Sequence, residues 1–206
     1  MLSSPHKALR LLAVLAIATA SPPAAAHLVS TRFGEFYAGL LHPLTTMQHL
    51  VPWIALGLLA VLQGKADTRR NVLVFPVAVA LGVVVGGLVP GYTAPAFLNL
   101  ISIAVLGAML ALARPLSSRA FYLLAGITGL SHGYDNAVAN LGIWDSVLYV
   151  SGVAAAAYLL IVLLGAGSLS MLRFAWGLIA ARAAGSWILA SGLLFGAFTL
   201  VGPSGV

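Results

Sequence analysis

Long apolar runs dominate the chain, and short polar or proline- and glycine-containing segments separate them. The hydrocarbon core of a bilayer is about 30 Å thick, so a helix of roughly 20 apolar residues can cross it. The pattern predicts an all-α membrane protein with a bundle of six transmembrane helices. We expect these helices at residues 36–62, 72–89, 97–113, 121–141, 147–169 and 183–201. Residues 169–182 are ambiguous, because they are apolar but bracketed by arginines, which suits a helix end or an interfacial turn.

The first 26 residues have the features of a secretory signal peptide. Basic residues between positions 6 and 10 precede a short apolar stretch at 11–20, and small residues follow, up to Ala26. This order is typical of a signal peptide with its cleavage site. We predict cleavage after Ala26, leaving residues 27–206 as a single six-helix domain; the alternative is an uncleaved first membrane helix.

The composition agrees with a multi-pass membrane protein. Hydrophobic residues make up 61% of the chain and charged residues only 7%, whereas soluble domains carry about 25% charged residues. The absence of cysteine excludes disulfides, thiolate metal sites, iron–sulfur clusters and cysteine nucleophiles. The net charge of +6 is a signal of membrane topology in such a protein, so we expect no nucleic-acid partner.

Basic residues predict the orientation of the chain in the membrane. They occur in alternate loops, after the first, third and fifth predicted spans, whereas the segments 90–96 and 142–146 contain none. Loops rich in Lys and Arg stay on the cytoplasmic side. A cleaved signal independently leaves the mature N-terminus outside. We therefore expect both termini in the periplasm and the protein in the bacterial inner membrane.

Five polar residues inside the predicted spans are the candidates for chemistry. His42 and His49 lie seven residues apart in the first span, and His132, Asp135 and Asn136 lie close together in the fourth. Ionisable side chains at membrane depth are rare and usually functional. Seven residues correspond to about two helical turns, so the two first-span histidines are expected on nearly one face.

The predicted orientation places these residues at matching depths. His49 and His132 would both lie near the middle of the membrane, and His42 would lie nearer the outside with Asp135 and Asn136. If the two spans are neighbours, these side chains line one outward-facing cavity. Such ligands suit a divalent ion such as Ni²⁺, Co²⁺ or Zn²⁺, and because neutral imidazole is the binding form, acid would weaken binding. The sequence does not show which way two further polar side chains, Asn99 and Ser102, face.

Each of these residues also has a purely structural interpretation. His42 could be an interfacial histidine bonded to backbone freed by Pro43. His49 or His132 could be a core histidine paired with a hydroxyl or a carbonyl. Asp135 could be a solvated charge or a partner of the nearby histidine. In addition, Pro52 is expected to kink the first span.

With these residues in place, the chain resembles the HupE/UreJ family of membrane metal transporters. The family's His-Pro-x-x-Gly-x-Asp-His motif corresponds to residues 42–49, and a motif like His-Gly-x-Ala-His-Gly corresponds to residues 132–137. The chain departs from these motifs at Thr46, Gln48 and Asn136, where the family has Gly, Asp and His. The resemblance implies a secondary permease, not an enzyme, that carries Ni²⁺ or Co²⁺ as cargo and holds no tightly bound cofactor.

Other functions remain open at this stage. His49 and His132 at matched depth could ligate a b-type haem, and the same metal site could serve an accessory protein that delivers metal without transporting it. A serine protease is a third alternative, but Ser131 and His132 are adjacent on a helix and point about 100° apart. No ATP-binding motif is present, so transport would draw on an ion gradient, the membrane potential or a partner. The expected partners are a divalent metal ion and the lipid bilayer; metalloenzyme assembly machinery or further copies of the chain are left open.

Overall fold

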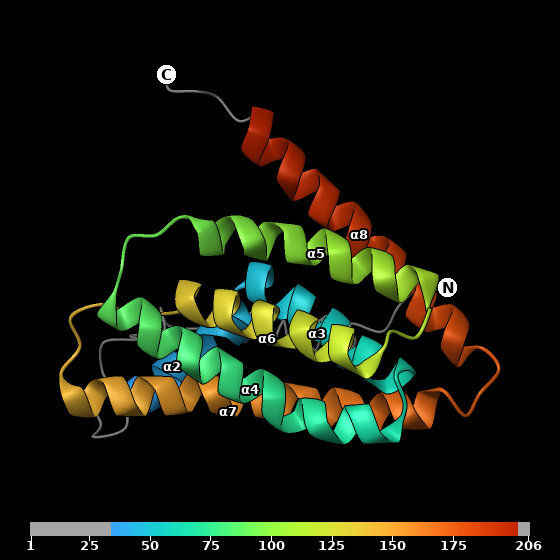
Figure 1. Cartoon of the computed structure of the whole chain (residues 1–206), viewed down its shortest axis with the longest axis horizontal. Helices are drawn as coiled ribbons and strands as arrows, with labels where there is room; N and C mark the ends of the chain where they lie inside the picture. The colour runs from blue at the N-terminus through green and yellow to red at the C-terminus, as the bar shows by residue number, and fades with distance from the viewer. Residues whose placement is uncertain (1–33, 202–206) are drawn as a thin grey trace, which may run out of the picture. The chain divides into compact units, whose positions relative to one another are not determined.

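The computed structural model describes residues 34–201, without the side chains of residues 65–68, 71, 200 and 201. Within this range the chain is all-helical and contains no strand, which confirms the all-α part of the predicted fold class. The predicted signal peptide, residues 1–26, lies outside the described residues. The helices are α2 (Gly34–Thr45), α3 (Met47–Leu62), α4 (Lys65–Leu88), α5 (Ala94–Leu112), α6 (Ser118–Asp135), α7 (Ile143–Met171) and α8 (Gly177–Val201) (Figure 1).

Three of the described helices, α5, α7 and α8, are long and apolar enough to cross a membrane, and the bent pair α2 and α3 makes a fourth candidate span. The apolar part of α4, Val72–Leu88, is shorter. Helix α6 has 18 residues, but Arg119, His132 and Asp135 make it less apolar. The number of six spans therefore stays a prediction.

The first predicted span, residues 36–62, is two helices and not one. Helices α2 and α3 meet at a bend of 75° around Thr46, whose backbone is extended. The Thr46 hydroxyl donates to the carbonyl oxygen of His42 at 2.8 Å, and such local bonds compete with a regular helix. The predicted kink site, Pro52, lies inside α3, which continues on both sides of it. The main bend is thus six residues earlier than the proline indicated.

Helix boundaries also differ in the second half of the chain. Helix α6 ends at Asp135, short of the predicted end at residue 141, because Asn136 ends the helix with its amide donating to the His132 carbonyl at 2.7 Å. The ambiguous segment 169–182 is divided between the end of α7, a short turn, and the start of α8. Arg182 lies within α8, where its Nε donates to the Ala111 carbonyl at 3.1 Å.

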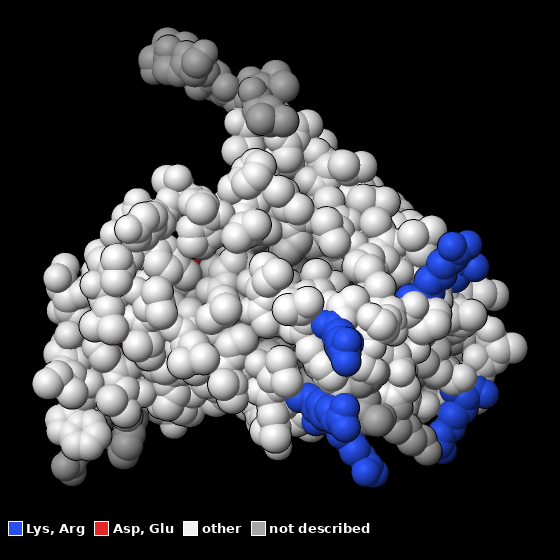
Figure 2. Space-filling model, in the orientation of Figure 1, with Lys and Arg blue, Asp and Glu red and all other residues white. Residues whose placement is uncertain are grey.

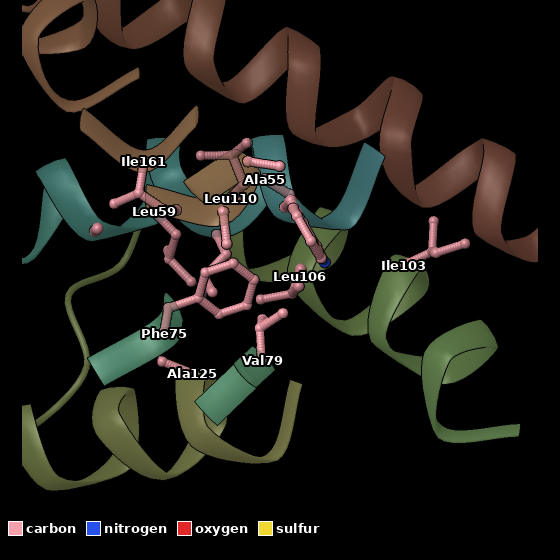
Figure 3. Close-up of a cluster of buried hydrophobic side chains, with 14 of the residues drawn as sticks. Ala55, Leu59, Phe75, Val79, Ile103, Leu106, Leu110, Ala125 and Ile161 are labelled. Carbon is pink, nitrogen blue, oxygen red and sulfur yellow. The ribbon is translucent and has the colours of Figure 1, made fainter. Parts of the chain in front are cut away.

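The core is built around α3, which lies among the other helices. Figure 3 shows side chains from α3, α4, α5, α6 and α7 in one buried cluster, including Leu59, Phe75 and Leu106. The fully buried Trp53 of α3 packs edge-on against Phe75, with ring centroids 5.3 Å apart. Glycines allow the backbones of α4 and α6, and of α5 and α8, to approach closely.

The surface has the features of a protein that contacts lipid. Large apolar side chains are exposed on each of the described helices, for example Leu73, Leu123, Leu163 and Trp187. The visible Lys and Arg side chains gather toward one end of the helices (Figure 2). Apolar exposure on this scale is typical of a membrane-embedded surface and not of a soluble monomer.

Candidate functional site

Helices α3 and α6 bring two of the predicted site residues into direct contact. The Nδ1 atoms of His49 and His132 are 2.9 Å apart, and the two rings lie edge to face with centroids 5.2 Å apart. Both side chains are buried, with 3% and 0% of their surfaces exposed. The structure thus places side by side the two histidines that the sequence assigned to matching depths, and their depth in a membrane stays a prediction.

The hydrogen bonds around His132 assign its tautomer. The Ser102 hydroxyl donates its only proton to the Asn99 carbonyl at 2.7 Å, so its oxygen must accept from His132 Nε2–H at 2.9 Å. The Nδ1 of His132 is then unprotonated and accepts from Nδ1–H of His49. This assignment leaves Nε2 of His49 as an unprotonated nitrogen as well.

The bend between α2 and α3 determines where His42 lies. On one straight helix, residues seven apart are displaced along the axis by about 10.5 Å. Here the ring centroids of His42 and His49 are 6.1 Å apart, because the chain folds at Thr46. The expectation that both lie on one face of one helix is wrong, although they remain neighbours. In contrast to His49, the His42 side chain is exposed.

Asp135 and Asn136 lie at the end of α6 in different environments. Asp135 is exposed, and its Oδ2 accepts from the Asn99 amide at 3.2 Å. Asn136 is 1% exposed; its amide caps α6, and its own carbonyl accepts from the Tyr149 hydroxyl at 2.9 Å. The side-chain oxygen of Asn136 has no hydrogen-bond partner in the described part of the chain.

A cavity of about 280 Å³ adjoins this site. Its polar lining comes from Gln48, Asn99, Asp135 and Thr199, and the rest is apolar. The buried side-chain oxygen of Asn99 has no hydrogen-bond partner within residues 34–201. Asn99 thus faces the cavity and the end of α6, and Ser102 faces His132, which hydropathy along the third predicted span could not show.

The predicted ligands do not form a closed metal site in the described residues. No group of three or more His, Asp or Glu side chains is placed to hold one ion there. The structure brings together His49 and His132, keeps His42 adjacent, and places Asp135 on the neighbouring cavity. The metal-binding role of these residues stays a prediction.

Comparisons with known proteins add one finding. The family model described as HupE / UreJ protein matches residues 14–195 of the chain. This range includes both histidine-containing motifs and the helices that carry them. No curated protein and no solved structure matches the chain.

Proposed function

This chain belongs to the HupE/UreJ family, which is associated with nickel or cobalt transport or metal delivery, and from that premise we propose that it is a permease for a divalent metal cation. The proposed cargo is Ni²⁺ or Co²⁺. The observation that carries the proposal is the buried contact between His49 and His132. Two imidazoles at membrane depth are costly to keep unless they have a function.

The hydrogen bonds around the pair favour metal binding over a purely structural role. A histidine ligand typically donates its second ring N–H to a fixed acceptor, which orients the ring. His132 has this arrangement, with Nε2–H held by Ser102 and Nδ1 free of a proton. A cation that binds at Nδ1 would replace the single proton shared with His49.

The separation of the two Nδ1 atoms also fits a cation. Two metal–nitrogen bonds of about 2.0–2.1 Å that meet at a right angle separate their nitrogens by roughly 2.9 Å. The observed separation is 2.9 Å, the length of the hydrogen bond between the rings, and two bonds to one ion would be compatible with it.

Additional ligands would come from side chains that are exposed in this structure. His42 lies next to His49, and Asp135 and Gln48 line the adjoining cavity. Gln48 stands where the family has an acid, so the site has fewer negative charges. Transport requires weak and exchangeable binding, which a site with few carboxylates can provide.

The histidine spacing disfavours the haem alternative. Axial nitrogens on opposite sides of one metal atom are about 4 Å apart, given bonds of about 2.0 Å. The 2.9 Å separation of His49 and His132 is too short for an iron atom to lie between them. Delivery of metal without transport uses the same residues and is distinguished below by experiment.

The test is uptake of Ni²⁺ and Co²⁺ by the full chain in proteoliposomes, comparing wild type with His49→Ala and His132→Ala. We expect both substitutions to abolish uptake at unchanged protein level, because each removes one of the paired ligands. Ser168→Ala is the control. Ser168 is also buried, but it lies near the C-terminal end of α7, a helix that carries neither histidine. Normal uptake by both histidine variants would refute the proposal. Histidine-dependent binding without uptake by the wild type would instead indicate metal delivery.

A further inference from the structure

We propose that the groove between α4 and α7, at the basic end of the helices, binds an anionic phospholipid whose phosphate lies between Arg69 and Arg173. The groove is separate from the histidine pair, and its lining contains none of the predicted metal-site residues. The inference therefore does not depend on which cargo the protein carries. A bound lipid here would be a structural partner of the helix pair.

The groove has a charged entrance and an apolar wall. Its volume is about 670 Å³. Apart from the two arginines, the lining side chains are apolar or absent: Val72 of α4, and Ile161, Val162, Gly165, Ala166 and Leu169 of α7. The small residues Gly165 and Ala166 leave space where larger side chains would fill it. This division matches a molecule that is anionic at one end and hydrocarbon along the rest.

The two arginines converge on the groove from different elements. Arg69 lies in the first turns of α4, and Arg173 follows the end of α7. Both side chains are exposed, and the side chains that the structure describes supply neither with an acidic partner. Guanidinium groups stay charged and bind phosphate oxygens through paired hydrogen bonds. Two such groups on one groove are complementary to a phosphodiester.

The expected position of the groove in the membrane, at the level of the lipid headgroups, favours a lipid over a soluble anion. Phe174 and Trp176, in the turn beside Arg173, are exposed and stack with ring centroids 5.7 Å apart. Tryptophan and tyrosine side chains are enriched at the level of the lipid headgroups, so Trp176 indicates that level. Arg173 would therefore lie at headgroup depth. The apolar wall lies one to three turns back toward the N-terminal end of α7, so it would lie beside the acyl chains. Basic pockets between transmembrane helices on the cytoplasmic side are known to bind anionic headgroups.

Native mass spectrometry of the full chain tests this inference. The protein is released from detergent after incubation with equimolar phosphatidylglycerol and phosphatidylcholine of identical acyl chains. We expect the wild type to retain phosphatidylglycerol preferentially. Arg69→Gln/Arg173→Gln should reduce that preference by roughly thirtyfold, since each arginine contributes to the attraction of an anionic headgroup.

A matched control removes the same charge elsewhere at this end. Arg70 and Arg119 are exposed and do not line the groove, so Arg70→Gln/Arg119→Gln should keep the preference. A second variant, Ala166→Leu, keeps both arginines and narrows the apolar wall. This variant should lower the retention of phosphatidylglycerol. Because Ala166 is exposed, the larger side chain fits there without disturbing the fold.

Three outcomes would overturn the inference. Equal retention of both lipids by the wild type would show that the groove does not select anionic headgroups. Preference that persists in Arg69→Gln/Arg173→Gln would place the lipid elsewhere. Displacement of phosphatidylglycerol by millimolar inorganic phosphate, with Ala166→Leu behaving as wild type, would identify a site for a soluble anion.

Discussion

His132 is held by partners on both ring nitrogens, and its fully buried position makes each partner necessary. Ser102 is the less evident of the two, because a serine in an apolar helix carries no distinctive sequence signal. Its hydroxyl connects the Asn99 carbonyl to the His132 ring. Ser102 thus determines which ring nitrogen of His132 carries the proton.

We expect Ser102→Ala to weaken Ni²⁺ binding by roughly 10- to 100-fold, as for other partners that orient a histidine ligand. The change should also lower the free energy of unfolding by about 1–3 kcal/mol, because it leaves a buried N–H without an acceptor. Metal titration and denaturation of the purified protein measure the two effects. Ser151→Ala, on the exposed side of α7, is the control and should leave metal affinity unchanged. Equal metal affinity in Ser102→Ala and wild type would contradict the assigned tautomer.

At the scale of elements, the contact between α4 and α6 determines where His132 lies. A Cβ atom added at Gly133 would collide with the Val79 carbonyl oxygen and lie 3.0 Å from the Gly82 Cα. These are backbone atoms, so a methyl group there can be accommodated only if the two helices move apart. Gly126 lies on the same helix, and a Cβ added there meets nothing within 4 Å.

Gly133→Ala should therefore destabilise the protein by about 1–3 kcal/mol, the usual cost of overpacking. Because Gly133 follows His132 directly, metal binding should fall as well. Gly126→Ala is the matched control and should be neutral or stabilising by no more than about 1 kcal/mol. Thermal unfolding in detergent compares the two variants. If both melt at the wild-type temperature, the close approach of α4 and α6 is not required.

At the scale of the whole molecule, the distribution of charge predicts the orientation of the chain in the membrane. The visible basic side chains gather at one end of the helices (Figure 2), as expected if the loops after the first, third and fifth predicted spans face the cytoplasm. Helices α4 and α6 extend about 36 and 27 Å at 1.5 Å per residue, given their 24 and 18 residues. Their lengths are near the hydrocarbon thickness although their polar residues make them less apolar than α5 or α7.

Reporter fusions test this topology and the number of spans together. We expect green fluorescent protein to fluoresce when fused after Gly64, Pro115 or Arg173, and alkaline phosphatase to be active after Gly91 or Gly142. The reason is that folded green fluorescent protein requires the cytoplasm and alkaline phosphatase the periplasm. As controls, each reporter is fused at the other reporter's sites, where we expect no fluorescence and no phosphatase activity. If the fusions after Gly64 and Gly91 both indicate the same side of the membrane, α4 does not cross it.

Apolar composition was sufficient to predict the helical class, and the positions of His49 and His132 predicted matching depths. The family resemblance came from the two histidine-containing motifs at residues 42–49 and 132–137. All of these can be read along one chain. The main bend of the first predicted span lies at Thr46 and not at Pro52. Hydrogen bonds of Thr45 and Thr46 with carbonyls of the preceding turn compete with a regular helix there. A proline is visible in a sequence, whereas this competition depends on the local fold.

The neighbours of the histidine pair depended on helix packing. Ser102 reaches His132, and Asn99 reaches the Ser131 carbonyl and Asp135, because α5 packs against α3 and α6. No pattern along α5 indicates which of its faces does so. The groove with Arg69 and Arg173 likewise exists only because residues about a hundred positions apart lie on adjacent helices. Hydropathy determines that a helix enters the membrane, but in lipid every apolar face is equally satisfied. Which faces meet is decided by close backbone packing and by buried hydrogen bonds.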